Sequence, residues 1–522
     1  MSNHSEAWKS QSWKKFQKGL FRLQKRIYKA MQDGDLRKVR NLQRLVLKSR
    51  AARMLAVRQV SQLNSGKKTC GVDGQKSLNF EQRLNLANKL KEANNWEHQG
   101  VREVKIPKKN GKIRTLKIPT ITDRAWQCLV KYALEPAHEA TFHARSYGFR
   151  PGRGTHDAQK YVFDNLSSLK KGREKRVIEL DIEKCFDRIS HSSMMSFVIA
   201  PQQIKMGLWK CLKAGVSPEF PEQGTPQGGV VSPLLANIAL NGIEDIHPSV
   251  RYADDMIFFL KPKDDAEKIL NQIQQFLAER GMNISAEKTK ITRATTGFNF
   301  LGWHFKVQEN GKFRCTPNEG NYEKLRKKVK AIVNNSALAT AAKAKKLGPI
   351  IRGWRNYHRY CRMDGPRFSL WYLDQDAFKR FSSDKNKGKD EAKRLVNQAF
   401  PMVPYSENKF VMVRGKKSPY DGDLLYWSKR NSNLYDGHTA RTLKRQGYKC
   451  GHCGLYLDGN EKVHLHHIDG NHDNWKTQNL TAIHESCHDY IHMKAKAQKA
   501  KIIQEPSAGK PASSVRKERC GG

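Results

Sequence analysis

The segment RYADDMIFFL, residues 251–260, places two adjacent aspartates before a run of five apolar residues. Apolar runs of this length are typical of buried strands, and aspartate is frequent in the turns that join strands. The segment therefore predicts a strand, a tight turn that carries Asp254 and Asp255, and a second strand. On these ten residues alone, an ordinary turn between two strands explains the pattern at least as well as a functional site does.

A third aspartate follows another apolar segment, VIELDIEKCF, which spans residues 177–186. VIEL is typical of a strand, and Asp181 comes directly after it. Nucleotidyl transfer uses two divalent cations, and magnesium prefers carboxylate ligands, so such a site needs about three aspartates from separate strands. Asp181, Asp254 and Asp255 could supply them, whereas Asp187 lies too far along the chain and is expected to be structural.

The net charge of the chain favours a polyanionic partner. It has 96 Lys and Arg residues against 50 Asp and Glu residues, a formal net charge of +46. A surface this basic binds polyanions with salt-dependent affinity, because binding releases counterions. An anionic membrane is the competing partner. However, no stretch approaches the roughly 18 apolar residues of a membrane span, and MSNHSEAWKS has no apolar signal core. Nucleic acid is therefore the expected partner.

Chain length and cysteine spacing indicate several domains and a reducing compartment. A chain of 522 residues is expected to form roughly three or four domains. Single, scattered cysteines are typical of free thiols in a reducing, cytoplasmic environment. The chain has six of these: Cys70, Cys128, Cys185, Cys211, Cys315 and Cys361.

A compact Cys/His segment near the end of the chain indicates a metal site. Eight of the eighteen histidines lie between residues 452 and 492. GYKCGHCG supplies a CxxC pair, and HESC supplies an HxxC pair, a spacing that suits a tetrahedral structural zinc. The predicted ligands are Cys450, Cys453, His484 and Cys487. Such a zinc would stabilise a domain that is too small to fold on its apolar core alone.

An ordered series of sequence blocks resembles a known family. The blocks are IPKKNGKIRTLKIPT, SYGFRPGRGTHDA, DIEKCFD, GTPQGGVVSPLLAN, RYADD, AEKTKI and FNFLGW. Their residues and their order along the chain are similar to those of group II intron-encoded proteins, which are reverse transcriptases. TCGVDG, residues 69–74, resembles the N-terminal extension motif of that family. A single YADD would be weak evidence, but the ordered series is specific and extends over nearly the whole chain.

The resemblance implies an α+β fold. We expect a right-hand polymerase with fingers, palm and helical thumb, then a DNA-binding segment and a small zinc-stabilised ββα-metal HNH nuclease. The implied boundaries are 1–95 for a basic helical N-terminal extension, 96–310 for fingers and palm, 311–380 for the thumb or maturase domain, 381–440 for the DNA-binding segment, 441–493 for the nuclease and 494–522 for a basic flexible tail.

Roles for individual polymerase residues follow from the same resemblance. Asp181, Asp254 and Asp255 match the magnesium-binding triad, and Phe186 matches the bulky residue that excludes a ribose 2′-hydroxyl. The remaining matches are nucleotide-binding residues: Arg102, Lys108 and Arg114 for the triphosphate, Gln227 beside the nascent base pair, where Gly228 and Gly229 allow close approach, and Lys288 near the pyrophosphate. The sequence departs from the family at Thr115 and Lys117, where proline and glycine are usual, and GIEDIHPSV before RYADD is short.

The segment IRGWRNYHRYCR lies where the family has its helical thumb, also called the maturase domain. Arginines interleaved with aromatic residues on a helix suit RNA, because guanidinium groups bind phosphates and rings stack on exposed bases. Arg352, Arg355 and Arg359 are the predicted RNA-binding residues. Trp354 and Tyr357 could stack on bases or belong to the core of the thumb.

VHLHHIDGNHDNWKTQNL resembles the HNH nuclease motif. His467 matches the general base. His466, His488 and His492 match the ligands of a catalytic divalent ion, and Asn479 matches a residue that braces the loop of the base. The alternative is a purely structural zinc knuckle, which explains the four zinc ligands but not these additional residues. Sequence spacing alone does not decide which of the two metals binds His484, His488 or His492.

The expected protein is thus an RNA-directed DNA polymerase of a mobile group II intron. It is also expected to bind its intron RNA as a maturase that assists splicing, and to nick target DNA with an HNH nuclease that primes synthesis. The resemblance implies magnesium, zinc and a nuclease divalent cation as cofactors, and intron RNA, target DNA and dNTPs as partners. Two alternatives are a splicing cofactor with a vestigial polymerase and a host-recruited reverse transcriptase without mobility. A bacterial cytoplasmic location is expected, and an organellar origin fits as well.

Overall fold

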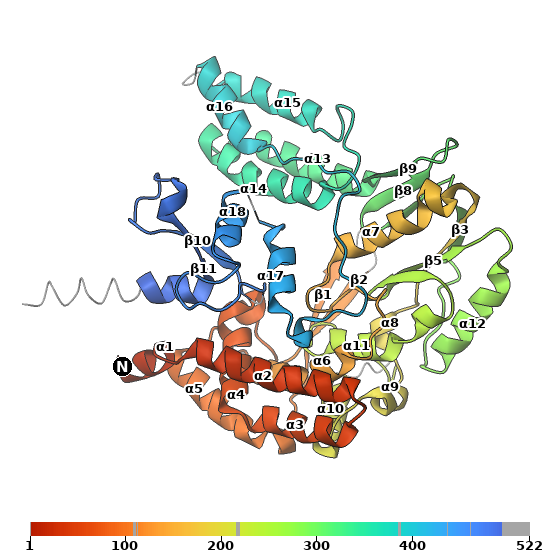
Figure 1. Ribbon diagram of the computed structural model, residues 1–522, viewed down its shortest axis with the longest axis vertical. Coiled ribbons are helices and arrows are strands. Elements are labelled where there is room, and N and C mark those ends of the chain that lie inside the picture. Colours follow the sequence, from red (N-terminus) through yellow and green to blue (C-terminus); the bar gives the residue numbers. More distant parts are fainter. Residues whose placement is uncertain are drawn as a thin grey trace, which may run out of the picture. The chain divides into compact units, whose positions relative to one another are not determined.

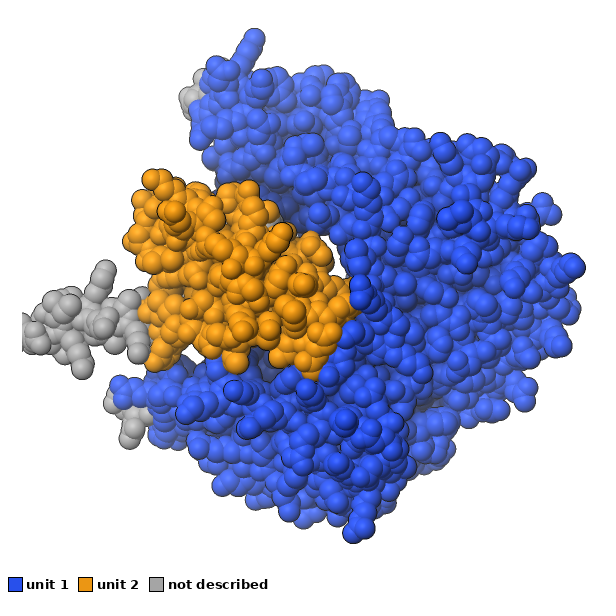
Figure 2. Space-filling view, viewed as in Figure 1, with its two compact units in different colours: residues 1–421 blue, residues 422–522 orange. Residues whose placement is uncertain are grey.

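The computed structural model describes residues 2–107, 111, 113–215, 220–384, 388–435, 437–459 and 461–492. The chain divides into two compact units, Met1–Asp421 and Gly422–Gly522, which Figure 2 colours separately. Both units contain helices and strands, as the predicted α+β class requires (Figure 1). Within the described ranges, no helix is both long enough and apolar enough to cross a membrane.

The N-terminal part of the first unit is helical, as expected for the N-terminal extension. The helices interrupted at Asp33 and Gly34 are α2 and α3, and Asp35 begins the second of them by accepting a hydrogen bond from the Lys38 amide at 2.9 Å. Their apolar faces pack in one core with the central helix α6. The bounds are α1 Ser2–Lys9, α2 Trp13–Gln32, α3 Leu36–Lys48, α4 Arg50–Arg58, α5 Phe80–Lys89 and α6 Ile121–Glu139.

A β-hairpin precedes α6, and its loop contains the Asn110-Gly111 pair, a sequence typical of hairpin turns. Its strands are β1 Arg102–Pro107 and β2 Ile113–Ile118, which pair antiparallel with Pro107 opposite Ile113. Lys108 belongs to the loop between them and lies outside the described residues. The backbone amide of Lys117 donates to the carbonyl oxygen of Gln227 at 2.9 Å, so the hairpin is hydrogen-bonded to the Gly/Pro loop that precedes α11.

The central sheet has four antiparallel strands in the order β4-β5-β3-β6. Side chains alternate along each strand, so Ile178 and Phe258 enter the core that contains α6, whereas Val177 and Phe259 enter a second core. The sheet is therefore buried on both faces. Its strands and neighbouring helices are β3 Arg176–Leu180, β4 Ser249–Tyr252, β5 Asp255–Leu260, β6 Lys290–Arg293, α7 Thr155–Leu166, α8 Cys185–Arg188, α9 His191–Phe197, α10 Gln202–Ala214, α11 Ser232–Leu240 and α12 Ala266–Ala278.

A three-stranded sheet and four helices complete the second core. The strands are β7 Phe298–Phe300, β8 Trp303–Val307 and β9 Phe313–Pro317, and the helices are α13 Glu319–Val333, α14 Thr340–His358, α15 Trp371–Ser382 and α16 Lys389–Ala399. The predicted thumb ends at residue 380, but α16 packs on α14 and α15 through Leu395, Val396 and Ala399. The predicted segment 381–440 is divided by the boundary between Asp421 and Gly422, so it is not one compact unit.

The second unit is built around a short antiparallel hairpin. Strand β10, Val463–His467, pairs with β11, Leu480–His484, with His467 opposite Leu480. Residues 485–492 are helical, which completes a ββα arrangement. Two further helices, α17 Leu424–Ser432 and α18 Gly437–Arg445, precede the hairpin, and Leu443 of α18 packs in the small core with Val463, Ala482 and Ile483.

Candidate active sites

The three predicted carboxylates lie at one end of the central sheet. Asp181 follows Leu180, the last residue of β3, and Leu180 pairs with Met256 of β5. Asp254 occupies the turn between β4 and β5, and Asp255 begins β5 opposite Tyr252. Because Asp181 and the turn are next to each other in this register, the sequence separation of more than seventy residues does not keep the carboxylates apart.

The turn that carries Asp254 is held by close backbone packing. Ala253, the residue before Asp254, has a φ of +60°, in the left-handed region that non-glycine residues rarely adopt. A Cβ atom added at Gly148 would lie 2.3 Å from the Ala253 nitrogen, so only glycine fits against the turn there. The Tyr147 amide also donates to the Arg251 carbonyl oxygen at 2.9 Å. The SYGF block thus forms one wall of the turn.

A buried ion pair lies directly behind the same turn. Arg251 and Glu244 have fully buried side chains, and their Nε and Oε1 atoms are 2.6 Å apart. One terminal nitrogen of Arg251 also donates to Asn237 Oδ1 at 2.9 Å and to the Ala253 carbonyl oxygen at 3.2 Å. Asn237 in turn donates to the Gly148 carbonyl oxygen at 2.9 Å. This network joins α11, the SYGF block and the aspartate turn.

Burial, together with crowding of negative charge, raises the pKa values of two aspartates. Loss of solvation raises the pKa of Asp255 to about 6, and repulsion from Asp254 and Asp181 adds to the shift. The pKa of Asp254 is also raised, mainly by burial, although the Arg114 guanidinium opposes the shift. An all-oxygen donor set with this excess of negative charge fits a hard divalent cation such as magnesium.

Lys288 holds Asp181 in an ion pair. Its Nζ atom lies 3.0 Å from Asp181 Oδ1, next to the carboxylates where the sequence predicted a cation. In the described part of the chain, two Cys/His groups have all their ligand atoms within 4.8 Å of one another, and the three aspartates are not such a group.

A pocket of about 390 Å³ opens beside the aspartates. Phe186, Gln227 and Arg114 all line it, so the structure brings together three of the predicted nucleotide-binding residues. Gln227 Nε2 donates to Asp187 Oδ2 at 3.3 Å, so Asp187 contacts a residue of the pocket lining. A Cβ atom at Gly228 would lie 2.8 Å from the Lys117 carbonyl oxygen, so Gly228 packs against the backbone of β2. The close approach to a nascent base pair stays a prediction.

Arg102 differs from its prediction. Its guanidinium donates to the Cys70 thiol at 2.6 Å, in the TCGVDG block, and Arg102 is absent from the described lining of the pocket. Phe149, in contrast, lines the pocket although no pattern in the sequence singled it out. Its ring packs edge-on against Phe186, with the ring centroids 6.4 Å apart.

The predicted RNA-binding arginines of α14 are not equivalent. Arg355 is only 4% exposed and donates to the carbonyl oxygens of Phe400, Pro401 and Ser369 at 3.0–3.1 Å. Its assignment to RNA is therefore wrong, because the guanidinium is committed to the loops that flank α15 and α16. Arg352 is exposed, and Arg359 is half-buried beside the Tyr360 ring.

The two aromatic residues between these arginines belong to the protein core. Trp354 is buried, and the ring of Tyr357 stacks on Trp303 with the centroids 4.7 Å apart and the planes 6° from parallel. The Tyr357 hydroxyl also donates to the Leu301 carbonyl oxygen at 2.6 Å. Of the two interpretations of these rings, the structure favours packing over base stacking.

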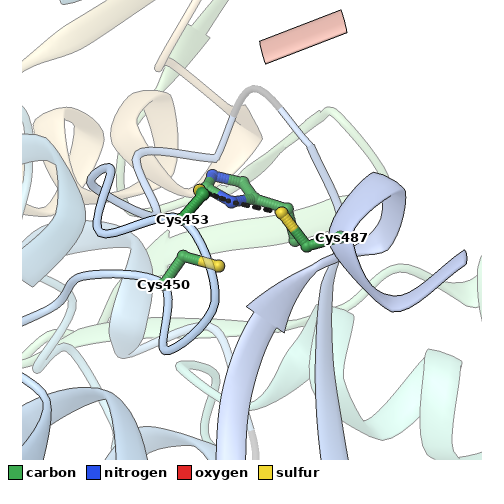
Figure 3. A group of neighbouring side chains, drawn as sticks. Cys450, Cys453 and Cys487 are labelled. Atoms are coloured by element: carbon green, nitrogen blue, oxygen red, sulfur yellow. Dashed lines mark hydrogen bonds between the residues drawn. The ribbon is translucent and has the colours of Figure 1, made fainter. Parts of the chain in front are cut away.

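In the second unit, the four predicted zinc ligands converge. The ligand atoms of Cys450, Cys453, His484 and Cys487 all lie within 4.8 Å of one another. Figure 3 shows the three sulfur atoms gathered around an imidazole ring. Hydrogen bonds from the Cys453 and Cys487 thiols lower the pKa of Cys450, which favours the thiolate form that binds metals. Two thiols before β10 and two ligands from β11 and the following helix suit a tetrahedral zinc.

A second group, formed by His466, His488 and His492, is separate from the first. The ligand nitrogens of these three histidines lie within 4.8 Å of one another, and the Nε2 atoms of His488 and His492 are 3.1 Å apart. Burial lowers the pKa of His488, and the neighbouring His492 adds to the shift, so the neutral form that binds metals is favoured. The structure thereby groups His484 with the cysteines, and His488 with His492.

His467 follows His466 on β10 but has different surroundings. Its side chain is 6% exposed and contacts the rings of His472 and Trp475, with centroid distances of 5.1 and 5.2 Å. His472, for which no role was predicted, is therefore a neighbour of the predicted base. Asn479 donates to Asp469 Oδ1 at 2.8 Å and accepts from the Asp469 amide at 3.0 Å. These bonds brace the loop that follows His467, in the position predicted for Asn479.

Comparison with known proteins assigns the first unit. Residues 106–305 match the family described as "Reverse transcriptase (RNA-dependent DNA polymerase)", 8–90 match "N-terminal domain of reverse transcriptase", and 322–381 match "Group II intron, maturase-specific domain". "Maturase-like protein 1" of Euglena gracilis is 38% identical over 391 residues, which are 74% of this chain and 85% of that protein. The chain belongs to the family of group II intron reverse transcriptases and maturases.

Other relatives of this reverse transcriptase carry related names. "Maturase-like protein 1" of Euglena longa is 35% identical over 85% of this chain and 97% of its own length. "Group II intron-encoded protein LtrA" of Lactococcus lactis subsp. cremoris is 29% identical over 41% of this chain and 48% of its own length. The Cys/His groups of the reverse transcriptase lie beyond residue 381, outside the three matched family ranges.

Proposed function

We propose that the first unit of this reverse transcriptase is an active, magnesium-dependent polymerase that copies RNA into DNA. The observation that carries the proposal is the common position of Asp181, Asp254 and Asp255 beside a pocket lined by Phe186 and Arg114. Two divalent cations, when bound, would supply charge neutralisation and an activated primer hydroxyl. Their presence would also lower the aspartate pKa values, which burial and, to a lesser extent, mutual repulsion now raise.

In this proposal, each pocket residue contacts a different part of the incoming nucleotide. Arg114 lies near Asp254 and attracts the triphosphate, for which a guanidinium is a matched donor. Phe186 faces the sugar and leaves no room for a 2′-hydroxyl, while Gln227 borders the base pair. Lys288, once released from Asp181, is free to meet the departing pyrophosphate.

Primer extension on an RNA template tests the polymerase. Asp254→Asn should abolish DNA synthesis while RNA binding stays near the wild-type level, because the substitution removes a metal-binding charge at a turn that backbone packing holds. The exposed Asp245, which pairs weakly with His143, offers a matched control, and Asp245→Asn should retain synthesis. Absence of extension by the wild-type chain would favour the splicing cofactor with a vestigial polymerase. Loss of RNA binding in Asp254→Asn would assign Asp254 a folding role.

We propose group II intron RNA as the partner of the maturase domain. The +46 net charge of the chain and the exposed Arg352 on α14 support a long phosphate-binding surface. Sequencing of the RNA that co-purifies with the protein is the test. Enrichment of the RNA of a folded intron supports the proposal, whereas unrelated host RNA would favour the host-recruited reverse transcriptase without mobility.

We further propose that the second unit is an HNH nuclease with a structural zinc, and that it nicks target DNA to prime reverse transcription. Support comes from the separation of two ligand groups, Cys450, Cys453, His484 and Cys487 on one side, and His466, His488 and His492 on the other. His467 lies next to the second group but is not a member of it, as a base distinct from the metal ligands requires. A zinc knuckle alone needs only the first group.

Nicking of supercoiled DNA tests this second activity. His467→Ala should eliminate nicking and leave zinc content and polymerase activity unchanged, because the histidine is proposed to transfer a proton and not to bind a metal. The exposed His452 is a matched control outside both ligand groups, and His452→Ala should nick normally. If His467→Ala still nicks DNA, His467 is not the base, and the second unit is better interpreted as a DNA-binding zinc knuckle.

A further inference from the structure

Phe149 has an unusual combination of exposure and backbone conformation. Its side chain is 49% exposed although it is a large apolar residue. Its φ is +57°, in the left-handed region, which is unfavourable for an aromatic residue. Strained residues of this kind persist only where the surrounding structure determines them, and they concentrate at functional sites. Neither the strain nor the exposure contributes to stability, so both call for a role outside the folded core.

The neighbours of Phe149 are fixed on both sides. Tyr147 is buried, and Gly148 lies against the Ala253 backbone of the aspartate turn. Arg150 is 5% exposed, and its guanidinium binds both carboxylate oxygens of Glu139 at 2.7 and 3.0 Å. These contacts hold the backbone of Phe149 in place, and its ring is the part of the segment that remains uncovered.

The ring of Phe149 faces the nucleotide pocket. It lines the pocket together with Phe186, Asp254 and Asp255. Its edge-on contact with Phe186 has an interplanar angle of 82°, an arrangement that is favourable for aromatic pairs. Phe186 is only half-buried, so this contact restricts the orientations of a ring that the rest of the core does not fully enclose.

We propose that Phe149 is a positioning residue for sugar selection, which holds the Phe186 ring in the orientation that excludes a ribose 2′-hydroxyl. The inference rests on the proposed function, in which Phe186 contacts the sugar of the incoming nucleotide. It adds a second aromatic residue, anchored to the aspartate turn through Gly148, so that the sugar gate and the catalytic carboxylates keep a fixed relation to each other.

Phe149→Gly is the decisive variant, because glycine accepts the left-handed backbone while the ring is lost. Its thermal stability should equal or exceed that of the wild type. Single-nucleotide incorporation with matched deoxy- and ribonucleotide triphosphates should show that the relative efficiency for the ribonucleotide rises by roughly 2- to 10-fold, the range expected for one aromatic contact. Phe149→Tyr should restore discrimination, since it keeps the ring.

Two further variants separate this inference from the proposed function. Phe186→Ala should relax discrimination more strongly, and adding Phe149→Gly to it should have no further effect, because the ring to be positioned is gone. Lys171→Gly is the control for backbone relief, since Lys171 is exposed and has a φ of +52° outside the pocket lining, and its discrimination should be unchanged.

The outcomes are distinguishable. Unchanged discrimination in Phe149→Gly with relaxed discrimination in Phe186→Ala would overturn the inference and leave the proposed sugar gate intact. Unchanged discrimination in both variants would overturn both. An equal loss of efficiency with deoxy- and ribonucleotides in Phe149→Gly would also overturn the inference, since it would show a general structural role.

Discussion

Replacement of Arg251 by methionine should both destabilise the first unit and misplace its aspartate turn. Methionine has a similar length and no charge, so Arg251→Met removes the guanidinium without adding bulk. The side chains of Arg251 and Glu244 are completely buried, and the substitution leaves the Glu244 carboxylate without its cation. The carbonyl oxygen of Ala253, immediately before Asp254, loses a donor at the same time.

The size of the effect follows from these contacts. Three hydrogen bonds disappear, at 2.6 Å to Glu244, 2.9 Å to Asn237 and 3.2 Å to Ala253. Removal of one partner from a buried ion pair costs about 3–5 kcal/mol, chiefly because the other charge stays buried. The second substitution Glu244→Gln removes that charge, so the double variant should recover roughly 2 kcal/mol, within the usual range for coupled neighbours.

Thermal unfolding and peptide-level hydrogen exchange are the measurements. The melting temperature of Arg251→Met should fall clearly, and amide protection across residues 249–260 should fall with it. A matched control is the exposed pair of Arg314 and Asp364, for which Arg314→Met should cost below about 1 kcal/mol. Primer extension by Arg251→Met should fall even at temperatures where the protein remains folded.

Either of two results would refute this prediction for Arg251→Met. A cost for Arg251→Met as small as that of Arg314→Met would show that the buried pair contributes no more than a surface pair. Full primer extension by a destabilised but folded Arg251→Met would show that the contact with the Ala253 carbonyl is not needed to position Asp254.

Three further predictions concern RNA binding, the zinc group and pH. Arg352→Ala should weaken RNA binding and reduce its salt dependence without loss of stability. Arg355→Ala should instead destabilise the protein by about 2 kcal/mol or more, because three carbonyl oxygens lose a charged donor. Filter binding and thermal unfolding of both variants are the measurements. Cys450→Ser should lower zinc per chain and make the second unit sensitive to proteolysis, and normal zinc content in that variant would refute the ligand assignment. Burial lowers the pKa of His138 from the ordinary value of 6.5 to about 3, so below pH 6.5 the unfolded chain binds more protons than the folded chain. The free energy of unfolding should therefore fall as the pH is lowered from 6.5 to 3, by up to about 1.4 kcal/mol per pH unit. His138→Gln should flatten this dependence in denaturation measured at pH 7 and pH 5.

Features set by short-range pattern could be predicted from the sequence. The strand-turn-strand around Asp254 is encoded by apolar runs and turn residues within twelve positions, and the structure has β4 and β5 there. The CxxC and HxxC spacings likewise predicted which side chains gather around Cys450, because two ligands on one turn move together. In both cases the chemistry of neighbouring residues was sufficient.

Features that depend on distant packing could not be predicted. Arg355 was assigned to RNA because helical spacing alone does not reveal that residues 400 and 401 cover that side of α14. Arg102 contacts Cys70, 32 residues earlier, and no local pattern connects them. Phe149 lies in the SYGFRPGRGTHDA block, but that block gave it no individual role, since its significance lies in a backbone angle and an uncovered ring.

The burial of the central sheet on both faces limits which parts of the enzyme can move. Alternate residues of β3 and β5 belong to two different cores, so neither strand has a face along which it could slide. Asp181 and Asp255 adjoin these two strands, and their positions are therefore set by both cores together. In the proposed polymerase reaction, we therefore expect motion in the exposed strand β1, while the sheet stays in place as template and primer advance past it.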